Sequence, residues 1–460
     1  MRSFNKGRAF TASVVGLGLA LSLAACGSDD EKKTETPGAS GDCAAYEQYG
    51  DLKGKTVSVY TSIVTPEDTP HIDSYKPFEE CTGAKITYEG SKEFEAQLLV
   101  KIKSGAAPDI AYIPQPGLLS TIAKDYPDAL VEASAGTVAN VDKYYSPSWK
   151  TYGTVDGTFY AAPLGANVKS FVWYSPKQFE KNGYKVPTTW DELIALSDKI
   201  LADHGAEGAK PWCAGIGSGE ATGWPATDWL EDMLLRTSGG DVYDKWLTNE
   251  VKFDSPEVKE ALAKVGEILK NPDYVNGGYG DVASIATTTF QDGGLPIVEE
   301  EPLCYMHRQA SFYAANWPEG TKVSETGDAF AFYLPGLTAD KRPLLGGGEF
   351  AAAFSDRPEV AAFQAFLASP EWNNSKAKST PAGGWVSANS GLDPENLASP
   401  IDKLAATLLG DTTQEFRFDG SDLMPAAVGQ GTFWTEMTSW LAEGKDDAAV
   451  LSAIQASWPK

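Results

Sequence analysis

Hydrophobic and polar positions alternate between two patterns from residue 55 onward. Short apolar runs typical of strands cover residues 56–60, 85–88 and 110–113. Each is followed by a segment with the spacing of an amphipathic helix, at residues 73–81, 94–102 and 117–124. This order predicts an α/β fold that begins with a parallel sheet covered by helices. Ligands of such sheets bind at the carboxyl ends of the strands, so we expect the functional loops after residues 60, 88 and 113.

A second block of the same kind occupies residues 167–323 and includes helical patterns at residues 190–203 and 258–269. Later apolar runs at 330–334 and 350–354 predict strands, and residues 358–367 and 431–443 predict helices. No period repeats along the sequence. After the first 25 residues, no apolar run is long enough to predict a transmembrane helix.

The first 42 residues have the pattern of an export signal and a tether. Three cationic residues precede an apolar stretch at residues 9–25, as in a secretory signal peptide. The stretch ends in Leu-Ala-Ala-Cys-Gly, which resembles a bacterial lipobox and predicts cleavage after residue 25 and lipidation of Cys26. Residues 26–42 carry no large apolar side chain and predict a flexible tether. The alternative is a plain secretory signal in which Cys26 is incidental.

The remaining cysteines fit an oxidising compartment outside the cytoplasm. Besides Cys26 the chain has Cys43, Cys81, Cys213 and Cys304, and four cysteines allow three disulfide connectivities. Proximity in the sequence favours Cys43 with Cys81 and Cys213 with Cys304. The alternative is four free buried thiols.

Composition narrows the class of protein. The 460 residues are enough for two or three domains, and 42% of them are hydrophobic, which is typical of a globular chain. The 38 Lys and Arg residues face 63 Asp and Glu residues, giving a formal net charge of −25. A field of that sign repels nucleic acid and anionic membrane surfaces, so we expect no nucleic-acid partner.

Several segments resemble one family of transport proteins. Residues 78–83 (FEECTG) and 105–110 (GAAPDI) resemble the extracellular solute-binding proteins of carbohydrate ABC importers, the group that includes maltose-binding protein. Further segments resemble its alpha-glucoside-binding branch: residues 114–117, 169–174, 217–225, 304–311, 354–360 and 417–425. Together they cover most of the chain in the order that the family has.

The resemblance implies a two-lobed periplasmic-binding-protein fold, with a multi-strand hinge and a ligand cleft between the lobes. By analogy, residues 43–163 plus 327–382 form lobe 1, and residues 164–326 plus 383–460 form lobe 2. The chain then crosses between lobes near residues 163–165, 327–330 and 383–387. The resemblance also implies that the protein is lipid-anchored at the outer face of the cell membrane. It captures an alpha-glucoside or similar oligosaccharide and delivers it to membrane permease subunits, as a monomer without a cofactor or catalysis.

A sugar needs polar groups for its hydroxyls and aromatic rings for its apolar faces, and such mixtures recur along the chain. The expected ligand-binding residues are Tyr60, Ser62, Asp109, Gln115, Asn167, Glu220, Thr222, Trp224, Asp228, Arg308, Gly348, Glu349, Trp385 and Trp434. Trp434 resembles the position at which maltose-binding proteins stack a Trp on a glucosyl ring.

Each of these residues also has a structural interpretation. Trp224 and Trp434 could pack in a core, and Asp109 could cap a turn. Residues 346–348 (GGG) could form a tight turn, and Trp385 could plug the hinge. Arg308 could pair with one of the three glutamates at residues 299–301.

Motifs for catalysis are scarce. The chain has three His residues and no HExxH, G-x-S-x-G, Walker A or G-x-G-x-x-G motif. The run Asp419-Gly420-Ser421-Asp422 lacks the full spacing of a calcium loop and is interpreted as a turn, so we expect no metal.

Two alternative functions remain. One is a secreted glycoside hydrolase that uses carboxylates such as Glu220 and Glu349. The other is the same fold binding a polyol or glycerol phosphate, although the candidate loops carry few Arg or Lys residues to pair with a phosphate.

Overall fold

The computed structural model of the chain describes residues 43–411 and 414–459. The predicted signal peptide, Cys26 and the tether, at residues 1–42, lie outside the described residues. Within the described part of the chain, no helix has both the length and the apolar character needed to cross a membrane.

A first sheet has the strand order β12-β11-β3-β1-β2, with β6 paired to β11. Its strands are β1 (Thr56–Thr61), β2 (Lys85–Gly90), β3 (Ile110–Ile113), β6 (Ala161–Val168), β11 (Leu344–Ala353) and β12 (Phe416–Phe418). β1 lies between β2 and β3 and is parallel to both, which confirms the predicted parallel start of the fold. β3 is buried along its whole length, as expected for a run of four apolar residues covered on both faces.

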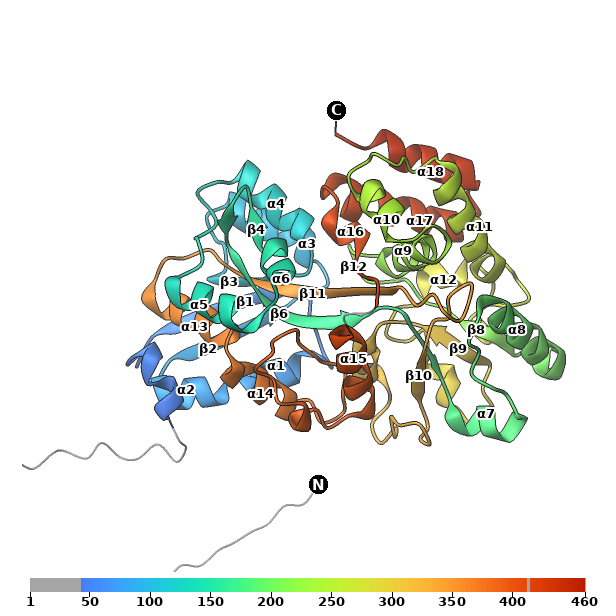
Figure 1. Cartoon of the computed structure of the whole chain (residues 1–460), viewed down its shortest axis with the longest axis horizontal. Coiled ribbons are helices and arrows are strands. Elements are labelled where there is room, and N and C mark those ends of the chain that lie inside the picture. Colours follow the sequence, from blue (N-terminus) through green and yellow to red (C-terminus); the bar gives the residue numbers. More distant parts are fainter. Residues whose placement is uncertain (1–42, 412–413, 460) are drawn as a thin grey trace, which may run out of the picture. The chain divides into compact units, whose positions relative to one another are not determined.

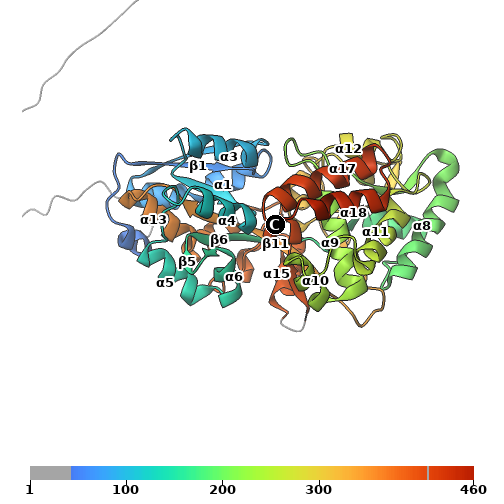
Figure 2. The same ribbon diagram turned by 90° about the horizontal axis from the view of Figure 1, so that it is seen from above.

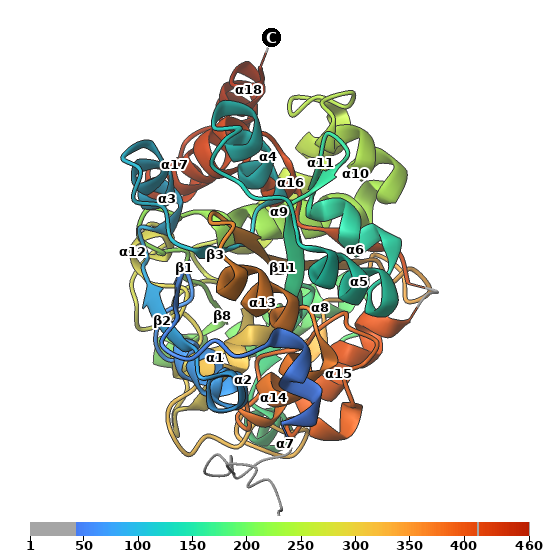
Figure 3. The same cartoon turned by 90° about the vertical axis from the view of Figure 1, so that its left-hand side faces the viewer.

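Helices surround the first sheet. Those at residues 94–103, 116–125 and 358–367 lie where the pattern predicts them, whereas the helix predicted at residues 73–81 begins at residue 68 and is divided into two. The helices around this sheet are α1 (Asp68–Ser74), α2 (Lys76–Thr82), α3 (Phe94–Lys103), α4 (Pro116–Asp125), α5 (Ala135–Tyr144), α6 (Pro147–Tyr152), α13 (Pro358–Leu367) and α14 (Pro370–Lys378). In α3 the apolar stripe of Phe94, Leu98 and Ile102 is buried, as the 3.6-residue period predicts. α13 packs on β1, β6 and β11, and Figure 3 shows it in front of β11. A short hairpin, β4 (Thr154–Val155) and β5 (Thr158–Phe159), follows α6.

A second sheet has the order β10-β7-β9-β8. Its strands are β7 (Phe171–Tyr174), β8 (Lys210–Cys213), β9 (Cys304–Arg308) and β10 (Phe330–Tyr333). The helices grouped with it are α7 (Pro176–Asn182), α8 (Trp190–His204), α9 (Trp224–Ser238), α10 (Gly240–Leu247), α11 (Pro256–Leu269), α12 (Ser284–Thr287), α17 (Trp434–Ala442) and α18 (Asp447–Ala456). Figure 2 shows α17, α18 and α11 side by side on this part of the chain.

The first sheet with its helices forms a first group of elements, and the second sheet with its helices forms a second group. The long strands β6 and β11 connect these two groups (Figure 1). They pair antiparallel, and β6 leads directly into β7 of the second sheet. β10 still pairs with β7, so the chain returns to the first sheet through β11, later than the crossing expected near residues 327–330. The Ala166 N–H donates to Val386 O at 2.9 Å, which places the segment at residues 383–387 beside β6.

The three glycines at residues 346–348 belong to β11, so the tight turn considered for them is wrong. A Cβ on Gly348 would clash with the carbonyl oxygen of Gly165 on β6. The absence of a side chain therefore allows β6 and β11 to approach each other. In the sequence, α15 (Pro400–Gly410) precedes β12 and α16 (Gly420–Leu423) follows it.

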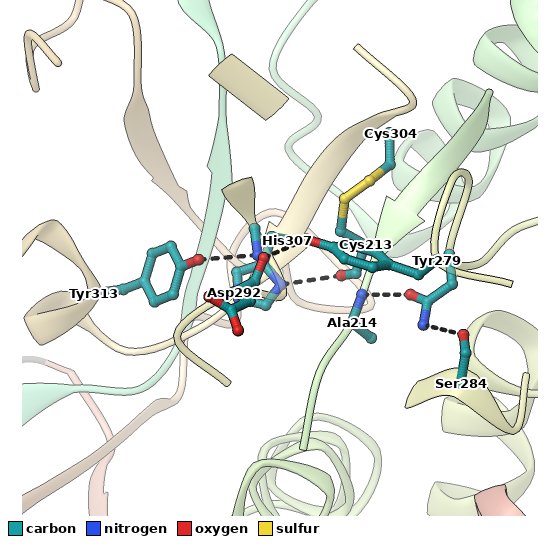
Figure 4. The surroundings of a disulfide bond; sticks show 10 residues. Cys213, Ala214, Tyr279, Ser284, Asp292, Cys304, His307 and Tyr313 are labelled. Atoms are coloured by element: carbon teal, nitrogen blue, oxygen red, sulfur yellow. Dashed lines mark hydrogen bonds between the residues drawn. A yellow bond between two sulfur atoms is a disulfide. The ribbon is translucent and has the colours of Figure 1, made fainter. Parts of the chain in front are cut away.

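Both disulfides form as sequence proximity favours, Cys43 with Cys81 and Cys213 with Cys304. The second joins the neighbouring strands β8 and β9 (Figure 4). Beside it, His307 Nδ1 lies 3.0 Å from the carbonyl oxygen of Cys213. Burial lowers the pKa of His307 to about 4, so its imidazole is a neutral part of the core.

Candidate ligand-binding site

A cavity opens at the carboxyl ends of β1, β2 and β3. We call it the main cavity; its empty volume is about 920 Å³, counted to the open solvent at its mouth. Its lining combines loops of the first sheet with residues from β6, β11 and the helices of the second group: Ser62, Ile63, Val64, Glu67, Lys92, Glu95, Pro114, Gln115, Asn167, Lys169, Ser218, Ala221, Trp224, Phe290, Gln291, Phe312, Gly348, Glu349, Asp419, Asp422 and Trp434.

Half of the fourteen residues expected from the sequence line this cavity. They are Ser62, Gln115, Asn167, Trp224, Gly348, Glu349 and Trp434. Gln115 Nε2 donates to Glu95 Oε1 at 3.0 Å, which orients the amide. The side-chain oxygens of Gln115 and Asn167 are buried without a hydrogen-bond partner among the described residues. Buried polar atoms are normally paired, so both are positioned to accept a bond from a ligand.

Aromatic rings form one wall of the main cavity. Trp224, the first residue of α9, lies with its ring centroid 5.2 Å from Phe290 and 5.9 Å from Phe312. Trp434 begins α17 directly after a π-helical segment (Ala427–Phe433), and its Nε1 donates to Ser421 Oγ at 3.3 Å. Helical irregularities of this type often accompany functional sites. The rings offer apolar surface on which the C–H face of a sugar could stack.

Two expected residues of the first sheet lie elsewhere. Tyr60 is buried in the core of the sheet against Phe94, with ring centroids 5.2 Å apart. Asp109 precedes β3 and therefore lies at the amino end of that strand, away from the cavity. There it accepts hydrogen bonds from the backbone and hydroxyl of Ser58 and forms an ion pair of 2.5 Å with Arg357.

The loop before α9 contributes to the main cavity through other residues than expected. Ser218 and Ala221 line it, whereas Glu220 is exposed and faces the carboxylate of Glu93. Thr222 instead closes a turn: its Oγ1 accepts from the Ser218 N–H at 3.0 Å and its hydroxyl donates to Gly219 O at 2.6 Å.

Asp228 and Arg308 are buried behind the cavity wall and bind each other. Arg308 Nη1 lies 3.5 Å from Asp228 Oδ2, and Nη2 donates to Asp232 Oδ2 at 3.0 Å. The alternative pairing of Arg308 with a glutamate at residues 299–301 is therefore wrong.

Trp385 lies beside β6 and outside the main cavity. Its Nε1 is 3.1 Å from the position that a Cβ on Gly165 would take, and it lines a smaller neighbouring cavity.

Six charged residues of the main cavity were not among the expected ones: Glu67, Lys92, Glu95, Lys169, Asp419 and Asp422. Lys169 and the two aspartates belong to segments that the family resemblance singled out. The sequence held no signal for the direction of their side chains, because that direction depends on how β6 and β12 each pair with β11.

Lys169 is the buried cation of the site. Its Nζ donates to Asp228 Oδ1 at 2.9 Å and also to Asp419 Oδ2, and it lies 5.1 Å from the centroid of Trp224. Burial alone would lower the pKa of Lys169, but the adjacent Asp228 and Asp419 raise it well above its usual value. Lys169 therefore stays charged and holds the floor of the cavity beneath Trp224.

Asp228, Glu231 and Asp419 place carboxylate oxygens close enough together to suit a metal ion. Lys169 already supplies a positive charge to two of these carboxylates. Glu231 accepts the backbone N–H groups of Gly420 (2.6 Å) and Ser421 (3.1 Å). The ion pairs with Lys169 and the backbone hydrogen bonds to Glu231 explain why these three carboxylates lie together. We therefore interpret the cluster as structural support for the cavity.

Most carboxyl groups that face the main cavity have raised pKa values; Asp419, which is paired with Lys169, is an exception. Burial raises the pKa of Glu67 to about 7, and it raises the pKa of Asp422 well above its usual value, with Asp419 adding to the effect. Burial also raises the pKa of Glu349, which the cations of Lys376 and Lys169 oppose. A protonated carboxyl both donates and accepts a hydrogen bond, as a sugar hydroxyl does.

Known proteins resemble the chain along most of its length. The alpha-glucosides-binding periplasmic protein AglE of Rhizobium meliloti is 39% identical over 425 residues, covering 89% of this chain and 88% of AglE. The osmoprotective compounds-binding protein GgtB of Synechocystis is 35% identical over 413 residues, covering 89% of this chain and 94% of GgtB. Among solved structures, maltose-bound MalE3 of T. maritima has a TM-score of 0.66 at 18% identity, covering 87% of this chain and 98% of MalE3.

These related proteins test two predictions made from the sequence, the fold class and the absence of catalysis. The neighbouring solved structures share the two-lobed α/β fold, which confirms the fold class. The related proteins are binding proteins and not enzymes, in agreement with the sequence analysis. The family profile described as bacterial extracellular solute-binding protein matches residues 58–374. The chain therefore belongs to the bacterial extracellular solute-binding proteins.

Proposed function

We propose that this protein is the substrate-binding component of an ABC importer and that it binds an alpha-glucoside or a similar hydroxylated solute in the main cavity. The observation that carries the proposal is the composition of that cavity, in a chain related to AglE over 89% of its length. Trp224 and Trp434 offer stacking surface, and Asn167, Gln115 and Glu349 offer polar atoms. This is the combination that a sugar ring requires.

Binding would couple to the relative position of the two groups of elements. The lining comes from both groups, through Gln115 after β3 and through Trp434 on α17. A solute that bridges both groups stabilises the arrangement in which it touches both, by the free energy of the interactions that only this arrangement allows. We propose that the groups act as lobes, that β6 and β11 form the hinge, and that the closed form delivers the solute to the permease.

We also propose that Cys26 carries a lipid anchor and that the folded part works as a monomer on the outer face of the cell membrane. The lipobox-like sequence supports the anchor. Metabolic labelling with a fatty acid should mark the wild-type protein and not Cys26→Ala. Label in both proteins would contradict the lipid anchor.

The glycoside hydrolase alternative loses its proposed catalytic pair in this geometry. Glu349 lines the main cavity, whereas Glu220 is exposed outside it. A phosphorylated ligand is disfavoured as well, because two lysines of the lining, Lys92 and Lys169, face five acidic residues. A polyol fits the lining as a second candidate, and GgtB is described as binding osmoprotective compounds.

Isothermal titration of the mature chain against maltose, trehalose, sucrose, palatinose, glucose, glycerol and glycerol 3-phosphate tests the proposal. We expect saturable one-to-one binding of an alpha-linked disaccharide without release of glucose. Binding of glycerol 3-phosphate alone would contradict the alpha-glucoside assignment, and glucose release would favour the hydrolase.

A further inference from the structure

A second, smaller cavity adjoins the main cavity. The two share five lining residues: Ile63, Glu67, Asn167, Phe312 and Glu349. We call the smaller cavity the annex; its polar lining includes Glu67, His71, Asn167, Glu349, Lys376 and Trp385. It lies on the side of β6 where Trp385 packs against α14.

The annex holds a buried lysine with few partners. Lys376 on α14 is 2% exposed, and its ammonium group donates to Thr380 Oγ1 at 3.0 Å. It forms no ion pair with any residue that the structure describes, but its Nζ lies 5.3 Å from the centroid of the Trp385 ring, as in a cation–π contact. An ammonium group has three donors, so the remaining donors of Lys376 are unused within the described chain. Burial lowers the pKa of Lys376 to about 7, and the nearby carboxylates of Asp402, Glu67 and Glu349 oppose this shift. An acceptor bound in the annex would stabilise the charged form of the lysine.

Other polar atoms around the annex are also unpaired. Trp385 Nε1, His71 Nδ1 and Asn167 Oδ1 are buried without a hydrogen-bond partner among the described residues. Burial lowers the pKa of His71 well below its usual value, and Lys376 adds to this, so the imidazole is neutral. The annex thus offers unused donors from Lys376 and Trp385 and an unused acceptor from Asn167.

This mixture selects the chemistry of an occupant. A hydroxyl group both donates and accepts, so a polyhydroxylated group can satisfy donors and acceptors placed on the same wall. A second anion is disfavoured, because Glu67 and Glu349 already face the annex with one lysine. A purely apolar group would leave Lys376 and Trp385 Nε1 unsatisfied.

We infer that the annex is a second subsite, which binds the compact polyhydroxylated unit linked to the glucosyl ring, with Lys376 as its main donor. In this arrangement the glucosyl ring lies in the main cavity beside Trp224 and Trp434. The inference rests on the proposed function, since it assumes a two-unit solute in the main cavity. It assigns Lys376 as the residue that distinguishes a two-unit solute from glucose.

The test compares three variants with the wild type by isothermal titration against glucose and the tightest-binding alpha-linked disaccharide. Lys376→Met keeps most of the side-chain length and removes the donors, and Trp385→Phe removes the indole N–H. The control Lys378→Met makes the same change at an exposed position of the same helix. Because Lys376→Met removes a buried charge with one hydrogen bond, we expect its melting temperature to be no lower than that of the wild type.

We expect Lys376→Met to weaken disaccharide binding about tenfold or more, the effect of one hydrogen bond to a charged group. Trp385→Phe should weaken it about threefold to tenfold, as for a neutral hydrogen bond. Lys378→Met should leave the affinity unchanged, and glucose should bind all four proteins equally.

Unchanged disaccharide affinity in Lys376→Met would overturn the inference. Equal losses for glucose and disaccharide would also overturn it, because the annex would then not be a separate subsite. A wild-type protein that binds glucose and no disaccharide would contradict the second subsite alone. A wild-type protein that binds no sugar would refute the proposed function itself, and this outcome appears before any variant is compared.

Discussion

Replacing Lys169 by methionine should remove one of the strongest buried interactions in the protein. The side chain of Lys169 is 7% exposed, and those of its partners Asp228 and Asp419 are 0% and 1% exposed. Without Lys169, two buried carboxylates lose their common counter-ion. Breaking a buried ion pair in this way costs about 3–5 kcal/mol of the free energy of unfolding, and we expect Lys169→Met to lose that amount at pH 7.

The loss should depend on pH in a defined direction. With Lys169 present, burial opposes ionisation of Asp419, but the lysine holds the pKa of Asp419 below its usual value. Burial raises the pKa of Asp228 to about 7 even with Lys169 present. Without Lys169, the pKa values of both Asp228 and Asp419 should lie above their values in the unfolded chain. The folded variant then binds protons more strongly than the unfolded one, so its stability falls as the pH rises from 5 to 7. The difference from wild type should be smaller at pH 5.

Urea denaturation followed by tryptophan fluorescence measures both effects. Lys177→Met is the matched control, because Lys177 forms a 2.6 Å ion pair with Asp328 and its side chain is 59% exposed. Exposed pairs contribute little to stability, so this control should unfold like the wild type. If Lys169→Met also unfolded like the wild type, Lys169 would not be the counter-ion beneath the cavity.

Three further predictions concern the cavity and its buried carboxyls. Trp224→Ala should weaken sugar binding up to about tenfold through loss of the stacking ring; unchanged affinity in a titration would place the sugar elsewhere. In Gly165→Ala the new Cβ would lie 2.8 Å from Glu349 Oε2 and displace that carboxyl. The affinity for sugar should therefore fall with little change in melting temperature. An affinity equal to that of the wild type would show that Glu349 does not contact the solute. Burial raises the pKa of Glu67 to about 7, so this carboxyl stabilises the fold at pH 5 and loses that effect as the pH rises to 7. In urea denaturation Glu67→Gln should therefore lose less stability than the wild type between pH 5 and pH 7, and equal losses would show that Glu67 is ionised throughout.

Local pattern was sufficient for the first βα units of the fold, whereas β10 was the one strand of the second sheet that it predicted. The apolar stripe of α3, the buried run of β3 and the left-handed Gly83 after α2 all follow from residues within a few positions of each other. β11 was predicted too short because glycines normally end strands. Its glycines at residues 346–348 remain in the sheet because β6, from a distant part of the sequence, lies against them.

The site was predictable only where a residue's position along its strand determines its exposure. Ser62 and Gln115 follow strands and reach the cavity, and Asp109 could have been set aside because it precedes β3. Asp228 and Arg308 looked like ligand-binding residues because of their chemistry. Their actual partners include each other, although they are far apart in the sequence, and no local pattern contains that pairing.

A crystal structure of the complex with the tightest-binding alpha-glucoside would show whether the main cavity is the solute site. We expect one ring beside Trp224 and Trp434, with its hydroxyls bonded to Asn167, Gln115 or Glu349. A sugar bound outside the main cavity, or bound there without contact to either tryptophan, would refute this site.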